Sequence, residues 1–517
     1  MQVPVVVTDK QGGHMRGLAK EDFTLLENGK EVKIANFEEL TATSEKLSPL
    51  PVPRGQFRNL TLNSSQPRNV AVIALDTINT PYLDQAYGRH ELIKFLAQNV
   101  SPGQVLALML ITSRGLKVVH GLTGDPGQLI AALKKAAGEI QPLETISTDA
   151  QADAVTGDMP LTVFSPYSTP FDALNSFVEY GDAIEAQFLQ QNAIETTMNA
   201  FLGIAESLSG VPGRKSLIWA TGGFPFAMDS PSTVPGGYLS LLYERTMLAL
   251  SDAEVSVYPV DVRGLVNTSI FAEGNRTKPV TGLNASRQLT NRLWLQQSKL
   301  DTLNDFAAMT GGKAFYNTND VAGSFRRAGD DASSYYMFGY YLDTHDKKPG
   351  WRKLSVKVRR KNAEVRARTG FFVTNATMNP LLSRNVDITT ALHSPIEDTG
   401  VPVTVQWLGV SSDGTSKKAV FFAHVPAGSL SFDPAGRNQL NFDFVALAYD
   451  KNGKEASQAA QSFTQPIPQD QLASVRAGGV GFRNALELLP GQYNVRFVVR
   501  DNVTGKVGSV TASLTVK

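Results

Sequence analysis

The stretch "VIALDTINTPYLDQAYGR", residues 72–89, contains a junction between a strand and a helix. Apolar residues at 70–75 predict a strand that is buried on both faces, and Asp76 follows it directly. A short polar loop then leads into a helix pattern at 83–99. Because α/β proteins commonly bind ligands at the carboxyl ends of their strands, Asp76 is the first candidate for a metal or ligand contact.

The same alternation of strands and helices continues from residue 69 to residue 332. Apolar runs predict further parallel strands at 105–111, 216–220 and 255–260. Helix patterns follow at 126–137, 184–208, 239–251, 300–310 and 321–328. Two segments rich in polar residues and turn formers, 140–176 and 266–296, are longer than most loops and are interpreted as insertions.

Patterns typical of β structure flank this α/β region. Residues 1–40 contain short strands and an Asn28-Gly29 hairpin turn, whereas 41–68 carry four prolines and indicate a linker or an extended wrapping segment. Residues 333–375 predict a three-stranded meander that completes the first module in one sheet or sandwich, with the α/β domain inserted between the two halves. From 380 to 517 we expect only strands, in a sandwich of immunoglobulin type.

Bulk composition excludes several classes of function. The 517 residues suggest about three domains, and 49 basic against 48 acidic residues leave no overall field that would attract nucleic acid. The absence of cysteine excludes disulfides, thiolate zinc sites and cysteine nucleophiles. Apolar runs fall far short of the roughly 20 residues of a membrane helix, so no transmembrane segment is expected.

Four segments in order resemble a von Willebrand factor A domain: "NVAVIALD" ending at Asp76, "KSLIWATGG" at 215–223, "VSVYPVDVRG" at 255–264 and "LNDFAAMTGGKAFY" at 303–316. The opening residues and "YYMFGYYL" are similar to the acidobacterial VWFA-related proteins, and the resemblance covers roughly residues 1–375. It implies a doubly wound, Rossmann-like sheet that binds other macromolecules. In this family a divalent metal often mediates binding, at a metal-ion-dependent adhesion site on the C-terminal edge of the sheet.

The sequence departs from the metal-binding pattern of that family. The first loop of such a site is Asp-x-Ser-x-Ser, and here Asp76 and Thr80 match it while Ile78 offers no oxygen. Gly222 stands where the third loop normally places its Asp. Mg²⁺ needs about six oxygens, so the resemblance implies a degenerate site in which Mg²⁺ binding at Asp76 and Thr80 is the less favoured interpretation. The alternative is that Asp76 caps the turn at Asn79 and Thr80.

Two other loops of the predicted edge carry candidate residues. In "ATGGFPF", 220–226, paired glycines could shape a binding notch, and the phenylalanines either fill the core or form an aromatic contact surface. At the end of 255–260, Asp261 and Arg263 form either a structural ion pair or part of the rim. The candidate binding residues are therefore Asp76, Asn79, Thr80, Thr221, Gly222, Phe224 and Asp261.

Motifs typical of zinc hydrolases, phosphate-binding loops and serine hydrolases do not occur in the sequence. We therefore expect a non-enzymatic, adhesion-type protein of the cell envelope or exterior that binds a protein partner through the C-terminal edge of the sheet. A structural scaffold whose β modules make the contacts is the alternative. A metal-assisted hydrolase, which would need Asp149, Asp153 or Asp158 to meet Asp76, is the third.

The compartment follows only from the resemblance. The usual export of the family favours a secreted or periplasmic protein, whose leader would be absent from this chain because Met1 opens almost directly on a strand. A cytoplasmic protein is the alternative.

Overall fold

A five-stranded sheet lies at the centre of the computed structural model, with strand order β10-β9-β6-β7-β8. Four strands are parallel: β6 (Val70–Asp76), β7 (Val105–Thr112), β9 (Lys215–Thr221) and β10 (Val255–Asp261). Edge strand β8 (Gly115–Thr123) runs antiparallel to β7 and was not predicted, because it is half exposed and lacks a continuous apolar run. After Gly312, Phe315 forms an isolated parallel bridge with Val260 of β10.

The structure describes eleven stretches of the chain: residues 1–43, 52–60, 68–136, 170–224, 237–265, 285–342, 350–373, 380–413, 416–432, 438–464 and 466–517. Among these residues, no helix has both the length and the apolar character needed to cross a membrane.

Helices cover both faces of the central sheet. Side chains of β6 alternate between two cores, so Val72 packs on one face and Ile73 on the other. The face of Val72 is covered by α4 (Pro170–Leu208), α5 (Gly237–Asp252) and α6 (Ala285–Thr310). The face of Ile73 is covered by α1 (Tyr82–Gln98), α2 (Pro126–Ala136) and α7 (Val321–Asp330). The unit is therefore an open α/β sheet with a helix layer on each side.

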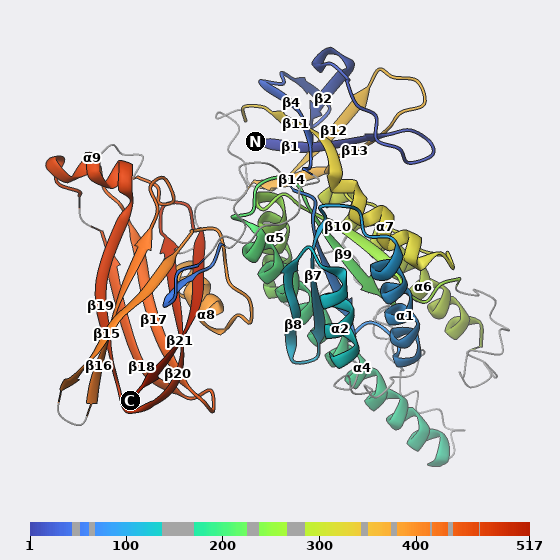
Figure 1. Cartoon of the computed structure of the whole chain (residues 1–517). Coiled ribbons are helices and arrows are strands. Elements are labelled where there is room, and N and C mark those ends of the chain that lie inside the picture. Colours follow the sequence, from blue (N-terminus) through green and yellow to red (C-terminus); the bar gives the residue numbers. More distant parts are fainter. Residues whose placement is uncertain are drawn as a thin grey trace.

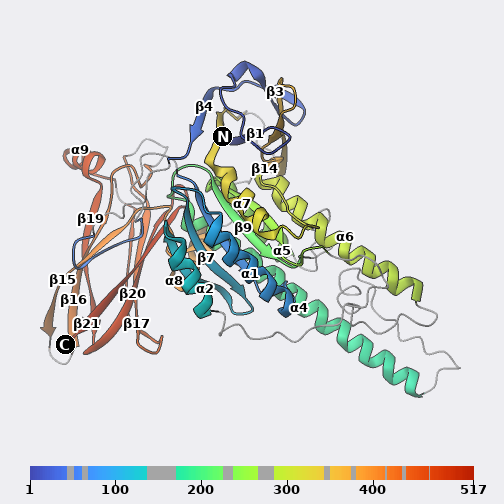
Figure 2. The same cartoon turned by 45° about the vertical axis from the view of Figure 1, so that its right-hand side comes forward.

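Two of these helices are longer than the sequence predicted. α4 begins at Pro170 and α6 at Ala285, so part of each predicted insertion, 140–176 and 266–296, is helical. Figure 2 shows both helices projecting beyond the sheet. These turns were predicted as part of the insertions because they adjoin segments rich in polar residues and turn formers. Residues 140–169 and 266–284 lie outside the described stretches.

The β segments predicted at 1–40 and 333–375 pair with each other in two four-stranded sheets. One contains β1 (Gln2–Thr8), β4 (Asn36–Thr41), β11 (Ser334–Gly339) and β13 (Glu364–Arg366). The other contains β2 (Phe23–Glu27), β3 (Lys30–Val32), β12 (Gly350–Val358) and β14 (Gly370–Val373). The predicted meander is wrong, because β11 and β12 lie in different sheets. At the β2–β3 turn, Asn28 and Gly29 both have positive φ, 48° and 81°.

This N-terminal β module covers the amino ends of the central strands (Figure 1). Arg214, which precedes β9 and is fully buried, donates its backbone N–H to the hydroxyl of Tyr335 at 3.0 Å. Its guanidinium lies 2.8 Å from the Tyr258 hydroxyl and 3.4 Å from Asp331, which also binds the guanidinium of Arg366. With the amino ends buried in this way, the carboxyl ends of β6, β9 and β10 face away from the module.

The C-terminal residues form a sandwich of two antiparallel sheets. One contains β15 (Thr404–Asp413), β16 (Ser416–Val425), β19 (Val480–Leu488) and β5 (Gln56–Arg58). The other contains β17 (Phe442–Asp450), β18 (Glu455–Phe463), β20 (Gly491–Asp501) and β21 (Val507–Val516). The prediction of strands alone is wrong, because α8 (Pro380–His393) and α9 (Gln469–Gly478) are helices. Assignment to the immunoglobulin type stays a prediction.

Strand β5 belongs to the segment 41–68, which the sequence predicted to be a linker or an extended wrapping segment. It pairs antiparallel with β15 at the edge of the sandwich, more than 300 residues later in the chain. Beside it, the Asn59 amide is buried, donates to the backbone oxygens of Asp398 and Val401 at 2.6 and 2.9 Å, and accepts from the N–H of Val403 at 2.9 Å. The segment thus completes one sheet of the sandwich before the chain enters the α/β unit.

The sandwich also contacts the end of α4. The N–H and hydroxyl of Thr399 donate to the backbone oxygens of Glu206 and Ser207 at 3.2 and 2.8 Å. Arg245 on α5 joins Asp387 on α8 at 2.6 Å and Glu206 at 3.5 Å. Partly buried hydrogen bonds and ion pairs therefore connect the α/β unit to the sandwich.

Candidate functional site

Asp76 lies at the carboxyl end of β6 in a closed hydrogen-bond network. Its Oδ1 accepts the backbone N–H groups of Ile78 and Asn79 at 3.1 and 3.0 Å. Its Oδ2 accepts the Asn79 amide at 2.8 Å, the Trp219 indole N–H at 3.0 Å and the Thr221 hydroxyl at 3.1 Å. Both oxygens are occupied by donors that the protein itself supplies.

Burial dominates the electrostatics of this carboxyl group. Asp76 is 2% exposed, and its desolvation raises the pKa of the carboxyl, while the donors from Asn79, Trp219 and Thr221 oppose that rise. Asn79 also donates to the hydroxyl of Thr197 on α4 at 3.2 Å, which ties the loop to the helix layer. The network therefore fixes the loop after β6 in one conformation.

The residues at this edge do not fit a Mg²⁺ site. The Thr80 hydroxyl accepts the N–H of Gly222 at 2.8 Å, and Ile78 supplies no oxygen. A Cβ on Gly222 would stand 2.9 Å from the Asn79 backbone oxygen and 3.0 Å from Cδ of Pro81, so a third-loop Asp has no room there. Among the described residues, no cluster of three or more acidic or histidine side chains could hold a metal. The oxygens of Asp76 and Thr80 accept donors from the protein itself, and Mg²⁺ binding there stays a prediction.

Most of the predicted binding residues belong to this buried network. Thr221 and Gly222 are buried and Asn79 is half-buried, so they shape the loops but offer little surface. Phe224 is fully buried and packs edge-on against Trp219, with ring centroids 5.6 Å apart. The prediction that Phe224 belongs to an exposed contact surface is therefore wrong. Phe226 lies outside the described residues.

Asp261 and Arg263 form the ion pair that the sequence suggested. Arg263 donates from Nη2 and Nε to the two oxygens of Asp261 at 2.7 and 2.9 Å, and its backbone N–H adds a third bond. The Asp261 side chain is fully buried. A remaining guanidinium nitrogen reaches Gln296 on α6 at 3.4 Å. The pair holds the loop after β10 against α6.

Lys299 on α6 is a charged residue of this edge that sequence reasoning missed. Its aliphatic stem packs on Gly223 at the end of β9, where a Cβ would come within 3.0 Å of it. Burial and the neighbouring Arg263 lower the pKa of its amine to about 8, although Asp261 acts in the opposite direction. Asp84 on α1 faces the same charges and is half-buried, and burial raises its pKa.

Three exposed apolar side chains lie on α1 and on the loop after β10. We call Leu83, Tyr87 and Leu265 the apolar rim; they are 76%, 36% and 62% exposed. Leu83 and Tyr87 lie one turn apart on α1, and the Tyr87 hydroxyl donates to the backbone oxygen of Asn319 at 3.3 Å. The side chain of Asn319 in turn accepts the N–H of Leu265 at 3.1 Å. The rim thus spans α1 and the loop after β10.

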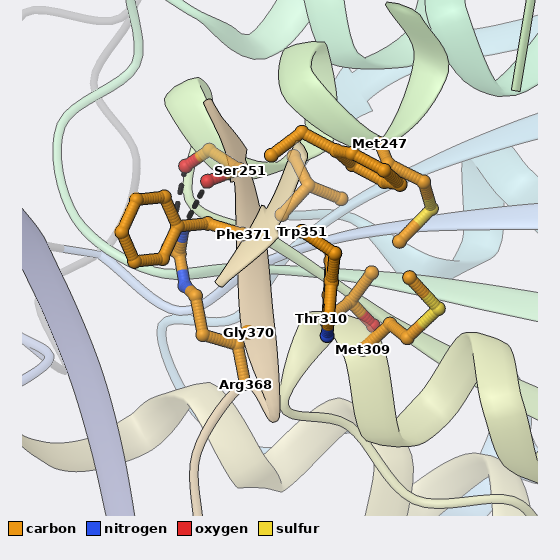
Figure 3. A pocket seen from close by; sticks show the side chains of 10 residues that line it. Met247, Ser251, Met309, Thr310, Trp351, Arg368, Gly370 and Phe371 are labelled. Carbon is orange, nitrogen blue, oxygen red and sulfur yellow. Dashed lines mark hydrogen bonds between the residues drawn. The ribbon is translucent and has the colours of Figure 1, made fainter. Parts of the chain in front are cut away.

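A cavity at the opposite end of the unit has a different character (Figure 3). It lies where α5 and the end of α6 meet the N-terminal β module, and Met247, Met309, Trp351 and Phe371 line it. Arg368, 5% exposed, donates to the backbone oxygen of Ser251 at 3.3 Å across it. Apolar chains with one internally bonded arginine indicate a packing junction between modules, and the carboxyl edge remains the candidate site.

Comparison with known proteins adds little. No family model and no curated protein matches the chain. Among solved structures, a β-glucuronidase of glycoside hydrolase family 2 matches 22% of this chain and 11% of its own, at 10% identity and a TM-score of 0.15. A family 2 member from Bacteroides cellulosilyticus matches 35% and 20%, at 12% identity and a TM-score of 0.15. The Bacteroides uniformis β-glucuronidase matches 35% and 19%, at 10% identity and a TM-score of 0.16. Similarities this low define neither a shared fold nor a shared activity.

Proposed function

We propose that this chain is a non-enzymatic, adhesion-type protein of the cell envelope or exterior that carries a von Willebrand factor A-like domain. The strand order of the central sheet supports the proposal, with helices on both faces and an antiparallel edge strand next to β7. The position of Asp76 at the end of β6 supports it as well. The binding surface is the carboxyl edge of the sheet, where loops stand on a rigid scaffold.

The observation that carries the proposal is the apolar rim. Leu83 and Leu265 are more than half exposed at the end of the unit that the N-terminal module leaves open. Exposed apolar side chains beside charged ones are typical of a protein-binding surface, because a partner that covers them gains the free energy of apolar burial. The oxygens of Asp76 are occupied, so this recognition proceeds without a metal ion.

Affinity capture from the native envelope tests the proposal, with the whole chain as bait. We expect the double variant Leu83→Ser, Leu265→Ser to lose the captured partner while its thermal unfolding stays unchanged, since both side chains are exposed. Leu489→Ser is the matched control, because Leu489 on the sandwich is 62% exposed, like Leu265. Equal capture by the double variant and the wild type would contradict recognition through this edge.

A structural scaffold is the second candidate, and the contacts between modules favour it. The bonds of Thr399 to α4 and the pairing of β5 with β15 hold the parts of the chain together. In that case Leu489→Ser, on the sandwich, would weaken capture and the edge variant would not. The hydrolase hypothesis depends on Asp149, Asp153 and Asp158, which lie outside the described residues.

A further inference from the structure

Lys299 is a cation of the carboxyl edge whose amine donates no hydrogen bond within the described part of the chain, and Arg89 on α1, which lies beside Asp76, likewise has a buried Nη1 without a partner there. Arg263 spends its Nε and Nη2 on Asp261 and an Nη1 hydrogen on Gln296. The charges around the Lys299 amine are those of Arg263 and Asp261, and neither forms a hydrogen bond with it. Arg263 therefore occupies the Asp261 carboxylate, and the nearby Lys299 amine does not bind it.

Lys299 belongs to the same edge of the sheet as the apolar rim. Gln296 and Lys299 are three residues apart on α6 and share one face of the helix. Gln296 contacts Arg263, which lies two residues before Leu265. Lys299, Arg263 and Leu265 therefore lie along one edge, where the Lys299 amine has no hydrogen-bond partner among the described residues and Leu265 is exposed.

We propose that Lys299 receives a carboxylate side chain from an acidic, partly apolar segment of the protein partner, whose apolar residues cover Leu83 and Leu265. Charge complementarity identifies the occupant: Arg263 and Asp261 pair with each other, so the Lys299 ammonium attracts an acidic group, and a lysine that is largely desolvated gains more from such a pair than a fully exposed one. This inference rests on the proposed function, since it assigns a chemistry to the partner of the same edge.

Packing of the aliphatic stem of Lys299 fixes the position of its amine. Packing on Gly223 restricts the chain of the lysine, so little side-chain entropy remains to be lost when the amine forms an ion pair. Any side chain at Gly223, which has φ of 106°, would displace the lysine stem. The ammonium is therefore held at the edge before a partner arrives.

A labelled peptide of alternating leucine and glutamate is the probe, and its glutamine counterpart is the uncharged control. Fluorescence anisotropy with the full chain should show binding of the glutamate peptide that falls steeply with salt. Lys299→Met, which keeps the length of the stem, should weaken binding about tenfold. Lys299→Arg should restore most of it, and Lys135→Met on the exposed side of α2 should change nothing.

Each other result overturns the inference. Equal binding of the two peptides, equal binding by Lys299→Met and the wild type, or no binding of the glutamate peptide would each exclude an acidic contact at Lys299. The proposed function fails separately, because partner capture by the Leu83→Ser, Leu265→Ser variant decides it without reference to Lys299. Thermal unfolding of Lys299→Met checks that the variant is folded.

Discussion

Replacing Asp76 distinguishes a structural carboxylate from a metal ligand. Asp76→Ala removes the acceptor of the Trp219 indole N–H and the Thr221 hydroxyl, both fully buried and out of reach of water. A buried donor without an acceptor costs roughly 1–3 kcal/mol. The loop N–H groups of Ile78 and Asn79 are half-buried, and water can replace part of their bonds. The expected loss of unfolding free energy is therefore about 3 kcal/mol for Asp76→Ala.

Asp76→Asn is the sharper variant because it keeps the shape of the side chain. One oxygen becomes an NH₂ group that must face either the loop N–H groups or the Trp219 donor, so about 2 kcal/mol is lost. With a urea m-value of about 2 kcal/mol/M, the midpoint falls by about 1 M. Fluorescence of Trp219 reports the transition when Trp294, Trp351 and Trp407 are phenylalanine in every chain compared.

The opposite sign would refute this reasoning. In a site built for an absent cation, Asp76 is an uncompensated buried charge, and replacing it with asparagine would leave the midpoint unchanged or raise it. Mg²⁺ would then also raise the midpoint of the wild type. Asp301→Asn is the control, because Asp301 is exposed and accepts from Gln297, and its shift should stay within about 0.5 kcal/mol.

Three further predictions concern pH and packing. Burial and the nearby Asp398 carboxylate raise the pKa of Glu206 from 4.5 to about 8, so its contribution to docking the sandwich is complete below about 4.5 and is lost as the pH rises through 8. Calorimetric unfolding from pH 5 to 9 should show that loss, and Glu206→Gln should flatten it; a parallel loss in the variant would exclude Glu206 as its source. Gly222→Asp should lower the unfolding free energy by about 1–3 kcal/mol through its clash with the Asn79 backbone, without any stabilisation by Mg²⁺; a rise of the urea midpoint with Mg²⁺ would show that a site can be rebuilt. Burial acts to raise the pKa of Asp331, but Arg366 and Arg214 hold it below 3.8, so the stability it contributes is present above that pH and is lost as the pH falls further. Asp331→Ala should cost about 3 kcal/mol at neutral pH by leaving both guanidiniums without their carboxylate, and an unchanged urea midpoint would contradict that network.

The sequence predicted best those parts of the fold that are buried on both faces. β6, β9 and β10 are continuous apolar runs, and such runs have few alternatives to a parallel sheet. β8 was not predicted because its half-exposed residues do not alternate between apolar and polar. α8 was not predicted because the short helical pattern that follows Pro380 was interpreted as part of the β region. A local sequence pattern therefore predicts an element reliably only where a continuous run of its residues packs in the core.

At the candidate site the sequence identified the residues but not their exposure. The Asp76 loop and the pair of Asp261 and Arg263 stand at the expected strand ends, yet Phe224 is buried because Trp219 and α6 enclose it. Lys299 lies just before the helix predicted from residue 300, and nothing local distinguishes it from other lysines. Its role depends on Gly223 and Arg263, which are distant in sequence. Such tertiary neighbours cannot be found from spacing alone.

The pairing of β5 with β15 makes the order of synthesis matter. Residues 56–58 leave the ribosome more than 300 residues before their partner strand, so one edge of the sandwich waits for the whole α/β unit to be made. A fragment that ends near residue 375 keeps Asn59 without the backbone groups that satisfy its amide. A fragment that starts at residue 380 exposes β15 as an open edge, ready to pair with another chain. Cutting the chain between residues 375 and 380 would therefore leave Asn59 without its partners in one fragment and the edge of β15 unpaired in the other.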